Sequence, residues 1–142
     1  MIEKIEVDKK VYAIIIRNNY KKEGIEFFTP DNYSQQLGYM KRPSGYEIKP
    51  HIHKKISKKI EFTQEVLFIK SGKLRVDFYN NEKQYLESKI LIKGDVILLS
   101  EGGHGFKVID ECEIFEVKQG PYDEINDKER FEAKLDKETK IK

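Results

Sequence analysis

Short stretches of strand-like residues, each closed by a turn cluster, most constrain what this chain can fold into. The clearest example is residues 73–78, where apolar and charged side chains alternate strictly. Asn80-Asn81 follows, and such residues tolerate the positive φ of a tight hairpin turn. The chain then returns through residues 84–92. Because side chains two apart on a strand share a face, the pattern predicts a β-hairpin with one buried face.

Similar runs occur along most of the chain. Further predicted strands are residues 10–17, 25–29, 35–42, 65–70, 96–99, 106–109 and 112–118. So many short strands, separated by turn residues, predict an all-β sandwich or barrel. A length of 142 residues suits one domain. We assign residues 1–122 to this barrel.

The remaining residues, 123–142, form a charged C-terminal tail with few apolar side chains. Phe131 and Leu135 are spaced i, i+4, which is the spacing of one helix face. We therefore expect either a charged tail or a short helix docked on the barrel.

The charge balance excludes some functions. Lys and Arg number 27 and Asp and Glu 25, so nothing draws the chain to nucleic acid or to a membrane surface. No apolar run approaches a membrane span, and the first residues lack the apolar core of a signal peptide. Cys112 is the single cysteine, which suits a reducing compartment. We expect a soluble, cytoplasmic protein.

The three histidines and one carboxylate carry the chemistry. On a strand, His51 and His53 would direct both imidazoles to one side. Imidazole and carboxylate together are ligands for a divalent metal such as Zn, Fe, Ni or Mn. Glu65 and His104 are the further candidates, and Glu61 is an alternative carboxylate.

The spacing of these residues resembles a known family. Gly45, five residues and then His51-x-His53, followed by Glu65, six residues and Gly72, is similar to the first motif of the cupins. Eleven residues separate the histidine pair from Glu65, which places an insertion at residues 54–64. Only Glu65, and not Glu61, keeps the six-residue spacing to Gly72.

A second stretch supports the resemblance. Gly94-Asp95, followed by Ser100 to His104, is similar to the second cupin motif, with Ser100 in place of a proline and His104 one residue early. The resemblance covers residues 36–120. It implies a jelly-roll barrel, the cupin double-stranded β-helix, that holds one divalent metal. The implied ligands are His51, His53, Glu65 and His104.

The insertion also suggests what the protein binds. Four lysines lie within residues 54–59, where they either attract an anionic substrate or form a solvated loop. Candidate substrate-binding residues here and on the predicted strands are Tyr39, Arg42, Lys54, Lys55 and Arg75.

Three functions remain open. The first is a metal-dependent small-molecule enzyme, such as an isomerase or dioxygenase, acting on a polar, sugar-like or phosphorylated metabolite. The second is a metal-free sugar-nucleotide ketoisomerase or epimerase of polysaccharide biosynthesis, with His51 and His53 as acid and base. His-Lys-Lys at 53–55 and Pro-Tyr-Asp-Glu at 121–124 loosely resemble such cupins. The third is a non-catalytic barrel that binds a small ligand.

We also expect a homodimer. The resemblance implies two-fold pairing of subunits, and the β-rich segment 1–17 is the candidate interface.

Overall fold

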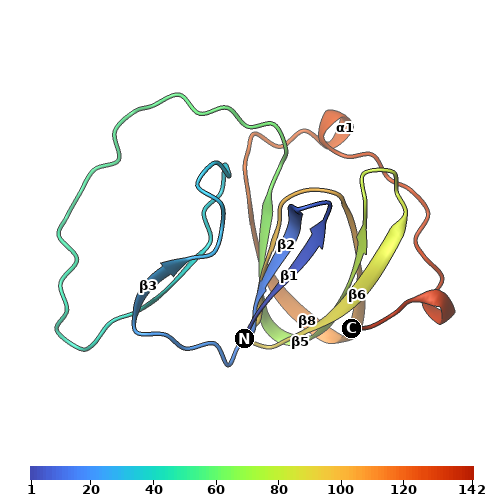
Figure 1. Ribbon diagram of the computed structural model, residues 1–142, viewed down its shortest axis with the longest axis horizontal. Coiled ribbons are helices and arrows are strands. Elements are labelled where there is room, and N and C mark those ends of the chain that lie inside the picture. Colours follow the sequence, from blue (N-terminus) through green and yellow to red (C-terminus); the bar gives the residue numbers. More distant parts are fainter.

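The computed structural model describes all residues, 1–142, and its regular structure is nearly all β (Figure 1). The strands are β1 (Ile2–Val7), β2 (Lys10–Ile16), β3 (Gly24–Phe27), β4 (Gly38–Lys41), β5 (Glu65–Tyr79), β6 (Tyr85–Ile92), β7 (Val96–Leu99) and β8 (Gly103–Lys118). The helices are α1 (Glu124–Asp127) and the 3-10 turn η1 (Asp136–Glu138). None of them is long and apolar enough to cross a membrane.

Six strands form one antiparallel sheet in the order β1-β2-β7-β5-β6, with β8 also paired to β5. The first half of β5 lies between β7 and β8, and its second half lies between β6 and β8. The two long strands β5 and β8 thus take part in both halves of the sheet. Figure 1 shows the sheet curling over on itself as a half-barrel.

An irregularity in the middle of β5 allows this curl. The pairing of β5 with β8 shifts register three times between Ile69 and Leu74. Leu67 and Ile69 belong to the apolar core before the shifts, and Leu74 and Val76 after them, so the core-facing set changes from odd to even positions. Bulges of this kind bend a strand and re-aim its side chains. Both halves of β5 therefore face the same core.

Gly72 lies at this bend with φ +80°. A Cβ built there would lie 1.9 Å from the backbone oxygen of Glu111 on β8. Glycine is thus required both by the left-handed conformation and by the close approach of the two strands.

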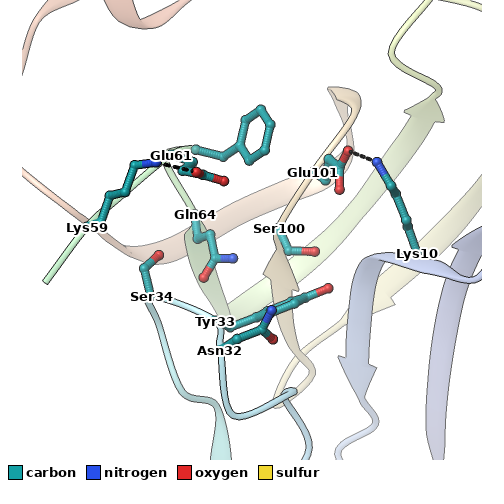
Figure 2. A pocket seen from close by; sticks show the side chains of 10 residues that line it. Lys10, Asn32, Tyr33, Ser34, Lys59, Glu61, Gln64, Ser100 and Glu101 are labelled. Atoms are coloured by element: carbon teal, nitrogen blue, oxygen red, sulfur yellow. Dashed lines mark hydrogen bonds and ion pairs between the residues drawn. The ribbon is translucent and has the colours of Figure 1, made fainter.

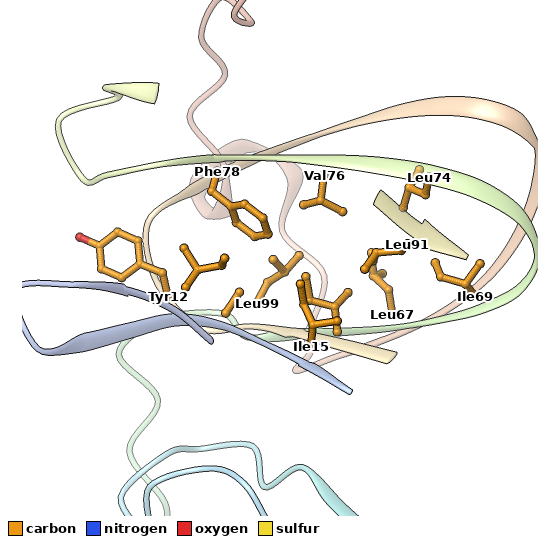
Figure 3. Close-up of a cluster of buried hydrophobic side chains, with 12 residues drawn as sticks. Tyr12, Ile15, Leu67, Ile69, Leu74, Val76, Phe78, Leu91 and Leu99 are labelled. Carbon is orange, nitrogen blue, oxygen red and sulfur yellow. The ribbon is translucent and has the colours of Figure 1, made fainter. Parts of the chain in front are cut away.

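The core fills the inside of the curl (Figure 3). Side chains from β5 face those from β2 and β7 across it, and β1 and β6 contribute at its edges. The buried cluster is Ile5, Tyr12, Ala13, Ile15, Leu67, Ile69, Leu74, Val76, Phe78, Leu91, Ile97 and Leu99. The predicted hairpin of residues 73–78 with 84–92 and the buried strand at 96–99 are both confirmed.

A smaller cluster lies on the opposite face of the sheet. Val11, Ile14 and Leu98 are buried there beneath residues 28–37, which contribute Phe28 and Tyr33. These residues connect β3 to β4, which pair only with each other. The predicted strands at 25–29 and 35–42 are therefore present but shorter than expected.

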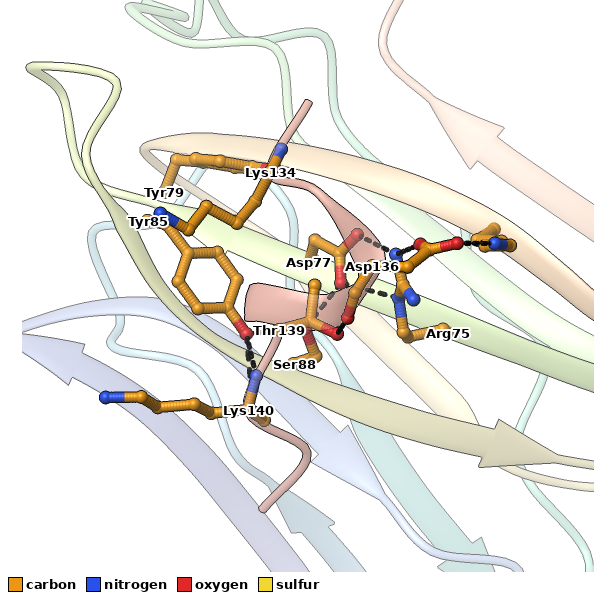
Figure 4. Close-up of polar contacts among 10 residues, drawn as sticks. Arg75, Asp77, Tyr79, Tyr85, Ser88, Lys134, Asp136, Thr139 and Lys140 are labelled. Carbon is orange, nitrogen blue, oxygen red and sulfur yellow. Dashed lines mark hydrogen bonds and ion pairs between the residues drawn. The ribbon is translucent and has the colours of Figure 1, made fainter. Parts of the chain in front are cut away.

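The C-terminal segment docks on the outer face of β5 and β6 (Figure 4). The Tyr79 hydroxyl accepts a hydrogen bond from the Lys134 backbone N–H at 2.9 Å, and the Tyr85 hydroxyl accepts one from Lys140 at 2.7 Å. Ser88 exchanges backbone hydrogen bonds with Lys140 and Lys142. The tail thus docks on the sheet without a helix through Phe131 and Leu135. The short helix α1 lies earlier, where Asp123 caps it.

Residues 42–64 contain no helix or strand and extend away from the half-barrel (Figure 1). The strand on which His51 and His53 were expected is therefore not formed. The predicted strands at 106–109 and 112–118 are one continuous strand, β8, and the run at 65–70 is the first half of β5.

Candidate functional site

The curl brings together two residues from opposite ends of the β5–β8 pairing. Glu65 begins β5, while His104 on β8 is the register partner of Phe78, near the end of β5. A straight strand from Glu65 to Phe78 would span about 40 Å. In the curled sheet, Oε2 of Glu65 lies 3.2 Å from Nε2 of His104.

A cavity of about 690 Å³ opens beside this pair. Glu65 is buried, and the His104 side chain is 28% exposed. The end of segment 42–64 and the C-terminal segment meet at the rim, where the Thr63 hydroxyl donates to the Asp127 carboxylate. Other lining residues include Leu99, Phe106, Glu116, Lys128, Arg130 and Phe131. The site has both polar and apolar lining side chains and is open to small solutes.

The carboxylate of Glu65 lies in a positive environment. Lys118 Nζ is 3.8 Å and Lys128 Nζ 4.0 Å from its Oε1. The hydrogen bond with His104 lowers the pKa of Glu65, and the two lysine charges lower it further, against the opposing effect of burial. Glu65 is therefore ionised at neutral pH and accepts a hydrogen bond from a ring N–H of His104.

Glycines set the position of His104. Gly102 has φ +73°, and a Cβ there would lie 2.5 Å from the Tyr12 ring. A Cβ on Gly103 would lie 2.9 Å from the Phe131 ring. The bend before His104 can pack between these two rings only because both residues lack a side chain.

The other two histidines lie elsewhere, on the exposed segment 42–64. The rings of His51 and His53 are 5.2 Å apart between centroids, and His51 Nδ1 contacts the Lys49 carbonyl at 3.1 Å. The structure thus contains two pairs, His51 with His53 and Glu65 with His104, and does not bring the pairs together. No group of three or more metal-ligand side chains gathers anywhere in the chain. The four-residue ligand set stays a prediction.

The five predicted substrate-binding residues do not line this cavity. Tyr39 packs edge-on against Tyr20, and Arg42 lies over the Tyr46 ring. Lys54 and Lys55 are exposed on segment 42–64. Arg75 is buried under the C-terminal segment, where it pairs with carboxylates. Contact of these five residues with a ligand stays a prediction.

A second hollow, of about 480 Å³, adjoins the first (Figure 2). Ser100 and Glu101 line both hollows. The Lys10–Glu101 ion pair at 3.3 Å lies on one side of it and the Lys59–Glu61 pair at 2.7 Å on the other. Its charges are thus matched within the chain. In the first cavity Lys128 and Arg130 lie among five lining carboxylates, and Lys118, which is paired with Glu116, lies close to Glu65.

Sequence reasoning did not identify Lys118 or Lys128 as site residues. Both lie beyond the second motif, and Lys128 belongs to the charged tail, whose course a strand pattern does not predict. The feature that identifies Lys118 as a site residue is its position opposite Glu65, and this position depends on the pairing of β5 with β8.

No family model, no curated protein and no solved structure matches this chain.

Proposed function

We propose that this chain binds a small, polar, anionic metabolite in the cavity beside Glu65 and His104, and that this pair moves a proton on it. The observation that carries the proposal is the 3.2 Å contact between the imidazole and a buried carboxylate at an open cavity. A carboxylate that holds one ring nitrogen of a histidine fixes its tautomer and leaves the other nitrogen to take or give a proton.

Cationic side chains close to the pair are the donors that an anionic group on the ligand would need, and they lie among five lining carboxylates. Lys118 and Lys128 lie within 4.0 Å of Glu65, and Arg130 also lines the cavity. Lysine and arginine bind phosphate and carboxylate groups through charge-assisted hydrogen bonds. A phosphorylated sugar or a nucleotide-linked sugar has both the anionic group and the carbon acid that proton transfer requires. The reaction class is therefore isomerisation or epimerisation of a sugar.

The fold supports this proposal at a coarser level. We propose that the half-barrel is a cupin jelly roll, whose two motifs end at Gly72 and His104. Gly72 at the bend of β5 and the glycines before His104 occupy positions where a side chain would clash. The motif glycines thus have a physical role in this chain.

A divalent metal is a second proposal. Glu65 and His104 fit as ligands, since a carboxylate and an imidazole lie together at one cavity. His51 and His53 do not fit as they are arranged, because they lie on the exposed segment. The observation that favours a metal is that each pair already places two ligand groups close together, at 3.2 Å between Glu65 Oε2 and His104 Nε2 and at 5.2 Å between the ring centroids of His51 and His53. A four-ligand site would require segment 42–64 to move to the cavity.

The experiment for the first proposal is proton exchange. Purified protein is incubated in heavy water with a panel of sugar phosphates and nucleotide-linked sugars, and deuterium uptake is read by mass spectrometry. Uptake by one substrate, lost in His104→Gln and kept in His53→Gln, supports proton transfer by the pair. Saturable binding of a panel member without uptake would instead identify a binding barrel. No uptake and no binding would overturn the proposal.

The metal is tested separately by elemental analysis of untagged protein. About one metal per chain, lost in His104→Gln and also in His51→Gln, would support the four-ligand site. Metal lost in neither variant would contradict it.

A further inference from the structure

The free edge of β8 is unpaired and carries exposed apolar side chains. β8 pairs only with β5, so its other edge has unpaired backbone N–H and C=O groups along sixteen residues. Apolar side chains are exposed on both faces of this strand, namely Phe106, Val108, Ile109, Ile114, Phe115 and Val117. Long apolar edges of this kind are sites of pairing with another chain.

The other edges of the sheet differ from β8. On β1, Glu3, Lys4 and Glu6 place charges along the edge. On β6, the C-terminal segment pairs at Ser88 through Ile141. Charges and covering segments are the usual protection of an edge. β8 has charged residues among its apolar ones, but no segment of the chain pairs with its free edge.

Segment 46–62 has the sequence pattern of a β-strand but belongs to no sheet. Its even positions are mostly apolar and its odd positions polar, which is the period of a β-strand. The apolar side chains are exposed, with Ile52 at 92% and Ile56 at 65%; the others are Tyr46, Ile48, Ile60 and Phe62. The segment extends away from its own half-barrel (Figure 1). It is therefore placed to meet a neighbouring molecule.

The charges of the two surfaces are complementary. Segment 46–62 has five lysines and two glutamates, whereas β8 has four carboxylates and two lysines. Lys54, Lys55 and Lys58 form no ion pair within the chain, and neither does Glu111 on β8. Segment 46–62 and β8 are also of similar length, about 50 Å when extended.

We propose that segment 46–62 of one copy of this chain adds as a strand to the free edge of β8 of a second copy, and that the exchange is reciprocal in a two-fold homodimer. Backbone hydrogen bonds would give the pairing its affinity, and the apolar and charged side chains its register. The interface is thus β8 with segment 46–62, and not the N-terminal segment 1–17.

Sedimentation analysis of three proteins tests the proposal. The wild-type chain is expected to be a dimer, and Ile52→Asp is expected to weaken dimerisation by about tenfold or more. Ile125→Asp, at a residue 87% exposed outside both surfaces, is the matched control and should leave the dimer intact. Because both residues are exposed, neither variant should unfold, which circular dichroism checks.

Several results would overturn the proposal. One is a wild-type chain that stays monomeric at the highest concentration tested, and another is a dimer that Ile52→Asp does not weaken. The variant Ile56→Cys, with Cys112 of β8 as its disulfide partner, distinguishes two possible occupants of the β8 edge: segment 46–62 of a second copy and the same segment of its own chain. A disulfide between chains supports the second copy, whereas one within a chain shows that the segment closes on its own β8.

Discussion

Arg75 on β5 lies 3.0 Å from Asp136 of the C-terminal segment, through its Nη2 and the Asp136 Oδ1. The same guanidinium contacts Asp77, whose other hydrogen-bond partner is the Ser88 hydroxyl. These contacts connect the tail to the sheet (Figure 4). A residue that the sequence suggested for substrate binding is thus part of a buried ion-pair network.

Replacing Arg75 by methionine should destabilise the fold. The side chains of Arg75 and Asp77 are only 8% and 5% exposed, so the variant leaves a buried carboxylate without its cation. We expect Arg75→Met to lower the free energy of unfolding by about 2–4 kcal/mol, measured by urea denaturation. Adding Asp77→Leu should recover part of this loss, because the unpaired charge is then removed. Equal stability of the single and double variants would contradict this account.

The bend of β5 should not tolerate a side chain at Gly72. Gly72→Ala adds a clash with the Glu111 carbonyl to the strain of a positive φ, and we expect a loss of about 3 kcal/mol or more. Gly45→Ala is the matched control. Its φ is also positive, at +81°, but nothing lies within 4 Å of the added Cβ. Its expected loss is about 1 kcal/mol, and similar losses at the two glycines would show that the close approach of β5 and β8 is absent.

Phe131 should contribute more to stability than Leu135. The Phe131 ring packs edge-on against Tyr79 at 5.0 Å, while Leu135 is 58% exposed. Thermal denaturation of Phe131→Ala should show a loss of about 1–2 kcal/mol, and Leu135→Ala a change within about 0.5 kcal/mol. A larger effect at Leu135 would favour the helix that the i, i+4 spacing suggested.

The contribution of Glu65 to the stability of the folded state should decrease as the pH falls. Its pKa in the folded chain lies below the usual 4.5, chiefly because of His104. A lowered pKa stabilises the folded state above the unfolded pKa, and this stabilisation is lost as pH falls through the folded value. The difference in unfolding free energy between wild type and Glu65→Gln should therefore be constant above about pH 5 and shrink below it.

A difference for Glu65→Gln that grows as pH falls would contradict the lowered pKa.

The sequence predicted the local elements better than their arrangement. Strict alternation at 73–78 and the Asn80-Asn81 turn were enough for the β5–β6 hairpin, because strand period and turn chemistry are local. The bend of β5 was not predictable, since it depends on how Gly72 meets β8. The same holds for the site. Spacing selected Glu65 and His104 correctly as neighbours, but Lys118 and Lys128 reach the pair only through sheet register and the docked tail.

Segment 42–64 is a case where a local pattern was not enough. The His51-x-His53 pair was expected on a strand, yet a strand needs a partner edge, and within its own chain the segment pairs with none. A local sequence pattern indicates which secondary structure a segment favours, but not which partner strand it pairs with.

The most direct test of the central claim is calorimetric titration of the protein with sugar phosphates and nucleotide-linked sugars. We predict that a ligand from this panel binds the wild-type chain, that His104→Gln weakens its affinity by about tenfold or more, and that His53→Gln leaves it unchanged. Equal affinity of wild type and His104→Gln for that ligand would show that the Glu65–His104 cavity is not the binding site.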